Sequence, residues 1–216
     1  MKYTGNAGFT HNQADKIGVL ITNLGTPQAP TKGALKPYLK EFLSDPRVVE
    51  VPRLIWWFIL NGIILNIRPK RSAEAYASVW SEQGSPLMVH TKAQAEALAK
   101  RCEREFGDDV IVDFAMRYGE PAVNKVIERM LSNGVRKLLV VPMYPQYSAS
   151  TVGSTFDAIA TDFQQRRWLP DFRFVSHYHD RPGYIKAVAE TIRQHWEING
   201  QAEKLILSYH GVPRRY

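Results

Sequence analysis

The fold is decided by residues 110–141, which read VIVDFAMRYGEPAVNKVIERMLSNGVRKLLVV. The apolar run Val110–Met116 is typical of a buried strand, and Lys137–Val141 repeats the pattern. Between them, Pro121–Ser132 has helical spacing, with a proline at its start and Asn133-Gly134 at its end. A strand, a helix and a second strand of this combined length form the unit that joins parallel strands. The stretch therefore predicts a βαβ unit.

The same alternation extends in both directions along the chain. Further apolar runs predict strands at Ile17–Asn23, Phe172–Ser176 and Lys204–Ser208, and helical patterns lie at Ser150–Arg166 and Arg181–Glu197. Because strands alternate with helices, we predict an α/β protein with a doubly wound parallel sheet and helices on both faces.

A long insertion separates the first predicted strand from the second. It holds helical patterns at Thr31–Leu43, Ser72–Trp80 and Thr91–Phe106, and one strongly apolar segment, Leu54–Ile67. That segment is interrupted by Asn61-Gly62 and is shorter than the roughly 20 residues that a membrane span requires. We therefore expect no membrane-spanning helix here.

Two tryptophans in this apolar segment, Trp56 and Trp57, leave three interpretations open. With Arg53 and Arg68 on either side, they could contact a membrane interface or line an apolar pocket. Alternatively, the segment forms a hairpin that is buried in the core. The sequence alone does not choose among the three.

Composition and charge favour a globular protein with an anionic partner. The 216 residues are 44% hydrophobic and 23% charged, and they carry a formal net charge of +7. Basic and acidic residues are interspersed, so we expect no nucleic-acid partner. The single cysteine, Cys102, rules out a disulfide within the chain and fits the reducing cytoplasm. Residues 1–13 lack the apolar stretch of a secretory signal, and we expect residues 1–16 to form a flexible tail.

Polar and aromatic residues collect at one edge of the predicted sheet, where ligands of parallel sheets bind. The carboxyl ends of the strands lead into Asn23–Pro27, Arg117–Gly119, Pro142–Gly153, His177–His179 and His210. An imidazole at a strand end makes His210 a candidate proton acceptor or metal ligand, with a structural hydrogen bond as the alternative. His177 and His179 alternate along a strand, which directs them to opposite faces and disfavours a shared metal ion.

Three features around this edge indicate the kind of ligand. The loop Pro142–Thr155 offers the flat face of Tyr147 and the hydroxyl of Ser148, and it lacks the glycine spacing of a phosphate-binding loop. Arg117 could pair with a ligand carboxylate or form a structural salt bridge to a nearby helix. Arg68 follows the apolar segment, so a cationic rim adjoins an apolar wall. Together they suit a large apolar molecule that carries carboxylates.

Five motifs follow one another along the chain: Leu20–Pro27, Tyr76–Trp80 with Gly84–Pro86, Arg117-Tyr118, Tyr144–Gly153 and Leu207–Pro213. In this combination the chain resembles the N-terminal part of the ferrochelatase family, whose members insert ferrous iron into protoporphyrin IX in the last step of haem biosynthesis. The resemblance implies a chelatase-like fold of two similar α/β lobes with a porphyrin cleft between them. Fe²⁺ and protoporphyrin IX are then substrates, and we expect neither a required cofactor nor an iron–sulfur cluster in this chain.

The resemblance also implies roles for individual residues. His210 matches the active-site histidine, as proton acceptor, iron ligand or both. Arg68 and Ser85 match positions near the porphyrin propionates, and the apolar segment with Trp56 and Trp57 matches the lip of the cleft. The other candidates for substrate contact are Arg117, Tyr118, Leu24, Tyr147 and Ser148.

Members of the family run on beyond the length of this chain. We therefore predict an N-terminal lobe at residues 17–170, with the apolar lip at 48–68, and the start of the second lobe or a crossover at 171–216. The family's acidic residues that face the histidine are absent here, so we expect the isolated chain to be inactive. A non-catalytic α/β protein that binds porphyrin or metal is the alternative function. The expected location is the cytoplasm, with peripheral membrane contact through Trp56 and Trp57 left open.

Overall fold

The computed structural model describes residues 3–5, 10 and 12–216. Within these residues the chain forms a four-stranded parallel sheet in the order β2-β1-β3-β4. Ile17 of the central strand lies opposite Val110 on one side and Lys137 on the other. The parallel α/β sheet and four of the five predicted strands are thereby confirmed. The strands are β1 (Lys16–Gly25), β2 (Val110–Tyr118), β3 (Val135–Pro142) and β4 (Asp171–Phe174).

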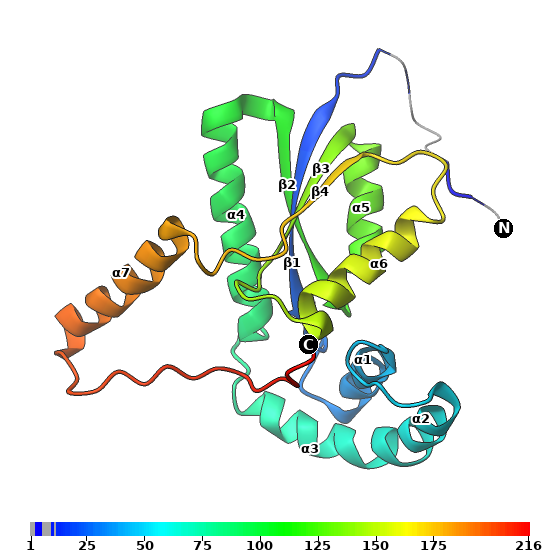
Figure 1. Ribbon diagram of the computed structural model, residues 1–216, viewed down its shortest axis with the longest axis vertical. Coiled ribbons are helices and arrows are strands. Elements are labelled where there is room, and N and C mark those ends of the chain that lie inside the picture. The colour runs from blue at the N-terminus through cyan, green and yellow to red at the C-terminus, as the bar shows by residue number, and fades with distance from the viewer. Residues whose placement is uncertain (1–2, 6–9, 11) are drawn as a thin grey trace.

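Helices cover both faces of the sheet (Figure 1). On one face α4 (Pro86–Phe106) packs on β2 and β1, and on the other lie α5 (Val123–Ser132) and α6 (Ser154–Phe163). The apolar stripe of α5 is buried against the strands, with Ile127 and Met130 almost completely inaccessible to solvent. Each such side chain stabilises the fold by about 1.5–3 kcal/mol.

The part of the insertion between β1 and β2 that precedes α4 forms a helical cap at the C-terminal edge of the sheet (Figure 1). Its helices are α1 (Lys32–Ser44), α2 (Arg53–Ile59) and α3 (Leu65–Ala77). The hydroxyl of Thr31 accepts a hydrogen bond from the Ala34 N–H and so begins α1. Apolar side chains of α1 and α3 pack with those at the end of β2 in a second core, separate from the core under α5.

The apolar segment Leu54–Ile67 is helical, so the alternative of a buried hairpin is wrong. A π-helical turn, Leu60–Ile64, joins α2 to α3 and contains the Asn61-Gly62 pair that interrupts the apolar segment. Leu60 and Leu65 are buried. Trp56, Ile59 and Ile64 are half-buried, and more than half of the surface of six further apolar residues is exposed, namely Leu54, Ile55, Trp57, Phe58, Ile63 and Ile67.

The C-terminal segment departs from the prediction. Helix α7 (Pro182–Asn199) has no buried residue, and Lys204–Ser208 is extended and exposed without pairing as a strand. An apolar run becomes a strand only where a neighbouring strand supplies hydrogen-bond partners, and no described strand lies beside this run. In Figure 1 the segment, in red, runs from α7 back to the C-terminal edge of the sheet. There the Ala149 N–H donates to the Tyr216 carbonyl oxygen at 3.4 Å.

The predicted lobe boundary at residue 170 stays a prediction, although β4 still pairs with β3. Of the predicted tail, residues 1–2, 6–9 and 11 lie outside the described residues. Thr4 exchanges backbone hydrogen bonds with Gln165 (2.8 Å) and Arg167 (3.0 Å), which fastens it to the turn before β4. None of the helices in the described part of the chain is long and apolar enough to cross a membrane.

Candidate functional site

Three loops with predicted site residues meet at the C-terminal edge of the sheet, as predicted. They follow β1, β2 and β3, which run in the same direction. The ends of β1 and β2, from which the first two loops start, approach closely: a Cβ at Gly25 would lie 1.8 Å from the Tyr118 carbonyl oxygen. Gly25 also has a φ of +107°, so only glycine fits this contact without strain.

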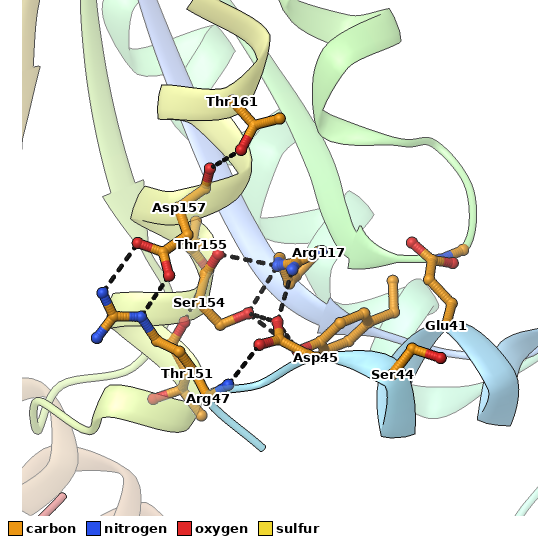
Figure 2. A network of polar contacts seen from close by, with 12 residues as sticks. Glu41, Ser44, Asp45, Arg47, Arg117, Thr151, Ser154, Thr155, Asp157 and Thr161 are labelled. Carbon is orange, nitrogen blue, oxygen red and sulfur yellow. Dashed lines mark hydrogen bonds and ion pairs between the residues drawn. The ribbon is translucent and has the colours of Figure 1, made fainter. Parts of the chain in front are cut away.

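A buried carboxylate lies at the centre of this edge (Figure 2). The Asp45 side chain, at the end of α1, is only 4% exposed. Its Oδ2 atom accepts hydrogen bonds from Arg117 Nη2 (2.6 Å), the Tyr118 hydroxyl (2.8 Å) and Ser154 Oγ (2.5 Å). Its Oδ1 atom accepts from the backbone N–H of Arg47 at 2.7 Å. Asp45 therefore joins α1, the end of β2 and the start of α6.

The negative charge of Asp45 is stabilised where it lies. Burial alone would raise the pKa of Asp45, but hydrogen bonds from Ser154, the Arg47 N–H and Tyr118, together with the Arg117 charge, lower it below its ordinary value. Arg117 Nε also donates to the backbone oxygen and the hydroxyl of Ser154, at 2.9 and 2.7 Å. Because burial raises the pKa of Tyr118 further above neutrality, this phenol stays protonated and able to donate.

A second ion pair, between Arg47 and Asp157, lies beside the Asp45–Arg117 pair (Figure 2). Arg47 Nε and Nη2 donate to the two carboxylate oxygens of Asp157, at 2.5 and 2.9 Å. Both side chains are more than a third exposed, so solvent screens this pair. Arg47 follows α1 and Asp157 lies on α6, so the pair connects the same elements as Asp45 does.

An open cavity of about 620 Å³ lies beside the network. Its lining includes Glu41, Asp45, Asp157 and Asp162, against the single cation of Arg117. Acidic walls repel a carboxylate ligand, so the cavity is not the predicted site for such groups. Among the described residues, no three His, Cys, Asp or Glu side chains are arranged to hold a metal ion.

Comparison with known proteins identifies the family. The sequence profile described as Ferrochelatase matches residues 16–216. The chain belongs to the ferrochelatase family. Over 216 residues it is 65% identical to the ferrochelatase of Idiomarina loihiensis and 64% identical to that of Pseudoalteromonas atlantica. Over 208 residues, 96% of the chain, it is 65% identical to the ferrochelatase of Teredinibacter turnerae. The first two matches cover the whole chain, but the three span only 59%, 60% and 57% of those relatives.

Family membership confirms the resemblance predicted from the motifs, and the structure shows where the matched residues lie. The side chains of Arg117 and Tyr118 both donate hydrogen bonds to Asp45, and they point into the protein rather than towards solvent. The carboxylate partner of Arg117 is Asp45, so the structural salt bridge considered as an alternative is the one that forms. Tyr118 is fully buried, and Leu24 is partly buried against the core of α1 and α3. Contact of the three with a substrate stays a prediction.

The loop after β3 carries two further candidates from the ferrochelatase motifs. Tyr147 is half exposed, and Ser148 Oγ lies 3.0 Å from Ser150 Oγ. A π-helical turn, Ala149–Gly153, leads from this loop directly into α6. Because Ser154 belongs to the Asp45 network, the network fixes one end of the loop.

The predicted anchors Arg68 and Ser85 lie on α3 and at the start of α4, where Arg68 is exposed and Ser85 is buried. The two tryptophans differ in role. Trp56 Nε1 donates to the Leu43 carbonyl oxygen at 2.6 Å and holds α2 on α1. Trp57 is exposed, and its ring meets that of its neighbour Phe58 edge-on.

The histidine matched to the ferrochelatase active site, His210, is exposed in the extended segment after α7 and does not end a strand. The prediction of its structural setting is therefore wrong, while its role stays a prediction. An ion pair of 2.8 Å between Arg215 Nε and Glu50 Oε2 fastens the following residues to the loop before α2. His177 and His179 lie at the surface after the end of β4 with their rings 5.7 Å apart, so the prediction that a strand directs them to opposite faces is wrong.

Sequence reasoning missed Asp45, Arg47, Ser154 and Asp157. Asp45 ends α1, and its backbone N–H donates to the Phe42 carbonyl oxygen. The sequence does indicate that Arg117 pairs with a carboxylate, because an arginine at the end of a buried strand needs an anionic partner. Nothing in the pattern, however, selects one of the 21 acidic residues as that partner.

Proposed function

We propose that this protein inserts Fe²⁺ into protoporphyrin IX to form haem, with residues 1–216 supplying the first lobe of the site. The observation that carries the proposal is the family match over residues 16–216, which contains every motif at the C-terminal edge of the sheet. Fe²⁺ and the porphyrin enter as substrates. The proposal assigns no resident cofactor to these residues and no iron–sulfur cluster, since several cysteines would be needed and Cys102 stands alone.

Metal insertion requires a group that can take up a proton near neutral pH. Two pyrrole N–H protons leave the macrocycle while the entering ion loses its water ligands. In this proposal the lone pair on the imidazole of His210 accepts a proton or binds the entering ion transiently. Solvent exposure of the segment that carries His210, and its attachment through Arg215 and Glu50, support this role.

The porphyrin needs both charged anchors and apolar walls. We assign its propionates to Arg68, whose exposed guanidinium suits a bidentate carboxylate, and to the hydroxyl of Ser85. Arg117 is paired with Asp45 and supports the wall rather than binding a propionate. Residues assigned to the walls are Leu24, Tyr147 and Ser148, whereas the fully buried Tyr118 supports the wall through its hydrogen bond to Asp45.

A membrane-surface role is part of the proposal, because a large apolar surface usually marks an interaction site. Helices α2 and α3 expose Leu54, Trp57, Phe58 and Ile67, each more than half accessible, and basic residues lie beside them. We propose that this surface, from Leu54 to Ile67, contacts an anionic membrane from the cytoplasmic side. A chain with the single cysteine Cys102 fits that location.

The membrane proposal is tested by sedimentation with anionic vesicles. We expect the wild type to sediment with them and the Trp57→Glu variant to remain largely in the supernatant. Phe106→Glu, at an exposed apolar residue that ends α4, serves as the matched control and keeps binding. Equal binding by Trp57→Glu and the wild type would remove the membrane from the proposal.

The catalytic proposal is tested by metal insertion, followed through porphyrin absorbance, with the longest natural form of the protein. His210→Ala should lower turnover by about a hundredfold or more, the scale of a lost acid–base group. His195→Ala, at an exposed histidine on α7, is the matched control and should leave turnover unchanged. Near wild-type turnover of His210→Ala contradicts the assigned role. Porphyrin binding without turnover in the wild type would favour the non-catalytic alternative.

A further inference from the structure

The side chain of Asp45 connects segments that are distant in sequence but lie together at the C-terminal edge of the sheet. Its partner Arg117 is 72 residues away and its partner Ser154 is 109 residues away. Its backbone carbonyl also accepts hydrogen bonds from the N–H groups of Val48 and Val49, at 3.1 and 3.0 Å. This one residue therefore holds the end of β2, the start of α6 and the turn that leads to α2.

The hydrogen bonds leave the side chains of Asp45, Arg117 and Ser154 little freedom to change conformation. Three donors converge on Asp45 Oδ2, and a buried charge that loses its partner is strongly unfavourable. Arg117 cannot turn towards an external carboxylate without leaving Asp45 unpaired. Ser154 is likewise bound, and it follows the π-helical turn that ends the Tyr147–Ser148 loop.

We propose that Asp45 is a positioning residue, which sets the geometry of the porphyrin site by fixing the Tyr147–Ser148 loop relative to the apolar helix α2. The inference rests on the function proposed above. It assigns Arg117 to the same task, as the counter-charge of Asp45 rather than as an anchor for a propionate. Neither residue touches the substrate in this assignment, and both act through the segments that they hold.

Loss of a direct anchor and loss of a positioning residue should differ in how strongly the effect on affinity depends on the charge of the ligand. An anchor recognises the propionate carboxylates, so its loss weakens a porphyrin dicarboxylate more than the dimethyl ester. Loss of a positioning residue displaces a loop and a helix and so weakens their contact with the macrocycle. Because both ligands contain the same macrocycle, both should lose affinity equally. The ratio of the two dissociation constants therefore separates the two roles.

The experiment measures binding of protoporphyrin IX and its dimethyl ester to the longest natural form of the protein, through quenching of tryptophan fluorescence. Asp45→Asn and Arg117→Gln should each weaken both ligands equally, by roughly tenfold to a hundredfold. The double variant should lose no more than either single variant, since both remove the same link. Asp157→Asn, which breaks only the exposed pair with Arg47, is the matched control and should bind nearly as the wild type does.

A milder variant covers the case in which Asp45→Asn does not fold. Ser154→Ala removes one donor to Asp45 and keeps the charge pair with Arg117. It should also weaken both ligands equally, and unchanged binding would contradict the proposal.

The remaining outcomes separate this inference from the proposed function. A selective loss of the dicarboxylate in Arg117→Gln would overturn the inference and make Arg117 an anchor. Wild-type affinity in a folded Asp45→Asn variant would overturn it and leave the proposed function standing. A wild-type protein that binds neither ligand would contradict both.

Discussion

Gly18 of β1 and Met130 of α5 approach so closely that no side chain fits between them. A Cβ at Gly18 would lie 2.8 Å from Met130 Cε, and it would lie 2.7 Å from Val135 Cγ1. Met130 is almost completely buried, so it has little room to move away. The absence of a side chain at this position is what lets α5 lie directly on the sheet.

Replacing this glycine should therefore destabilise the protein. We expect Gly18→Ala to lower the free energy of unfolding by about 1–3 kcal/mol, the usual range for an overpacked core. Gly33→Ala is the matched control, because Gly33 lies in α1 with no atom within 4 Å of an added Cβ. It should raise the free energy of unfolding by about 0.4–1 kcal/mol. Urea unfolding measures both, and an unchanged Gly18→Ala would contradict the packing described here.

The Asp45 network predicts a specific dependence of stability on pH. The pKa of Asp45 is lower in the folded protein than in the unfolded chain, so the folded state holds this proton less tightly. The stabilisation is complete above the unfolded pKa, near pH 4, and is lost as the pH falls through the lower folded pKa. Asp45→Asn should cost about 3 kcal/mol at pH 7, and this difference from the wild type should shrink towards pH 3.

Urea unfolding from pH 3 to pH 7 measures this difference. Asp157→Asn should cost at most about 1 kcal/mol at pH 7, because its pair with Arg47 is exposed. A difference between wild type and Asp45→Asn that stays constant over this range would exclude a lowered pKa of Asp45.

Charge pairing at Arg68 gives a third prediction. If Arg68 binds a propionate, Arg68→Leu should weaken a porphyrin dicarboxylate by about tenfold more than its dimethyl ester. Lys70→Leu, at an exposed cation on the same helix, should not discriminate between the ligands. Titration of tryptophan fluorescence with each ligand gives the two affinities. Equal losses for both ligands in Arg68→Leu would remove the anchoring role.

Exposed apolar residues near the C-terminal end of the chain give a fourth prediction. Ile185, Ile198 and Ile206 are each more than half exposed, on α7 and the segment after it. A protein of exactly these 216 residues should therefore self-associate, and we expect it to show no metal insertion. Light scattering and a zinc insertion assay test this together. A monomer with measurable turnover would show that the first lobe is sufficient.

The elements that sequence predicted well are those whose signal is local. The apolar face of α5 and the run Val110–Met116 carry their own periodicity, and both lie where predicted. Lys204–Ser208 carries the same kind of run without pairing as a strand, because pairing depends on a neighbour that periodicity does not reveal. The Asp45–Arg117 pair joins residues 72 positions apart, and no spacing rule connects them. Contacts of that kind need the fold before they can be recognised.

The position of β1 in the middle of the sheet bears on how the chain folds during synthesis. β1 is the first strand to be made, yet both of its partners, β2 and β3, come after residue 109. Until then its backbone groups have no strand to bond with, while all of α1 to α4 emerges. Closing so long a loop costs entropy before any pairing repays it, which slows folding and leaves an apolar edge open to other chains. A nascent chain stalled before residue 110 should therefore depend on chaperones more than one that has passed residue 142.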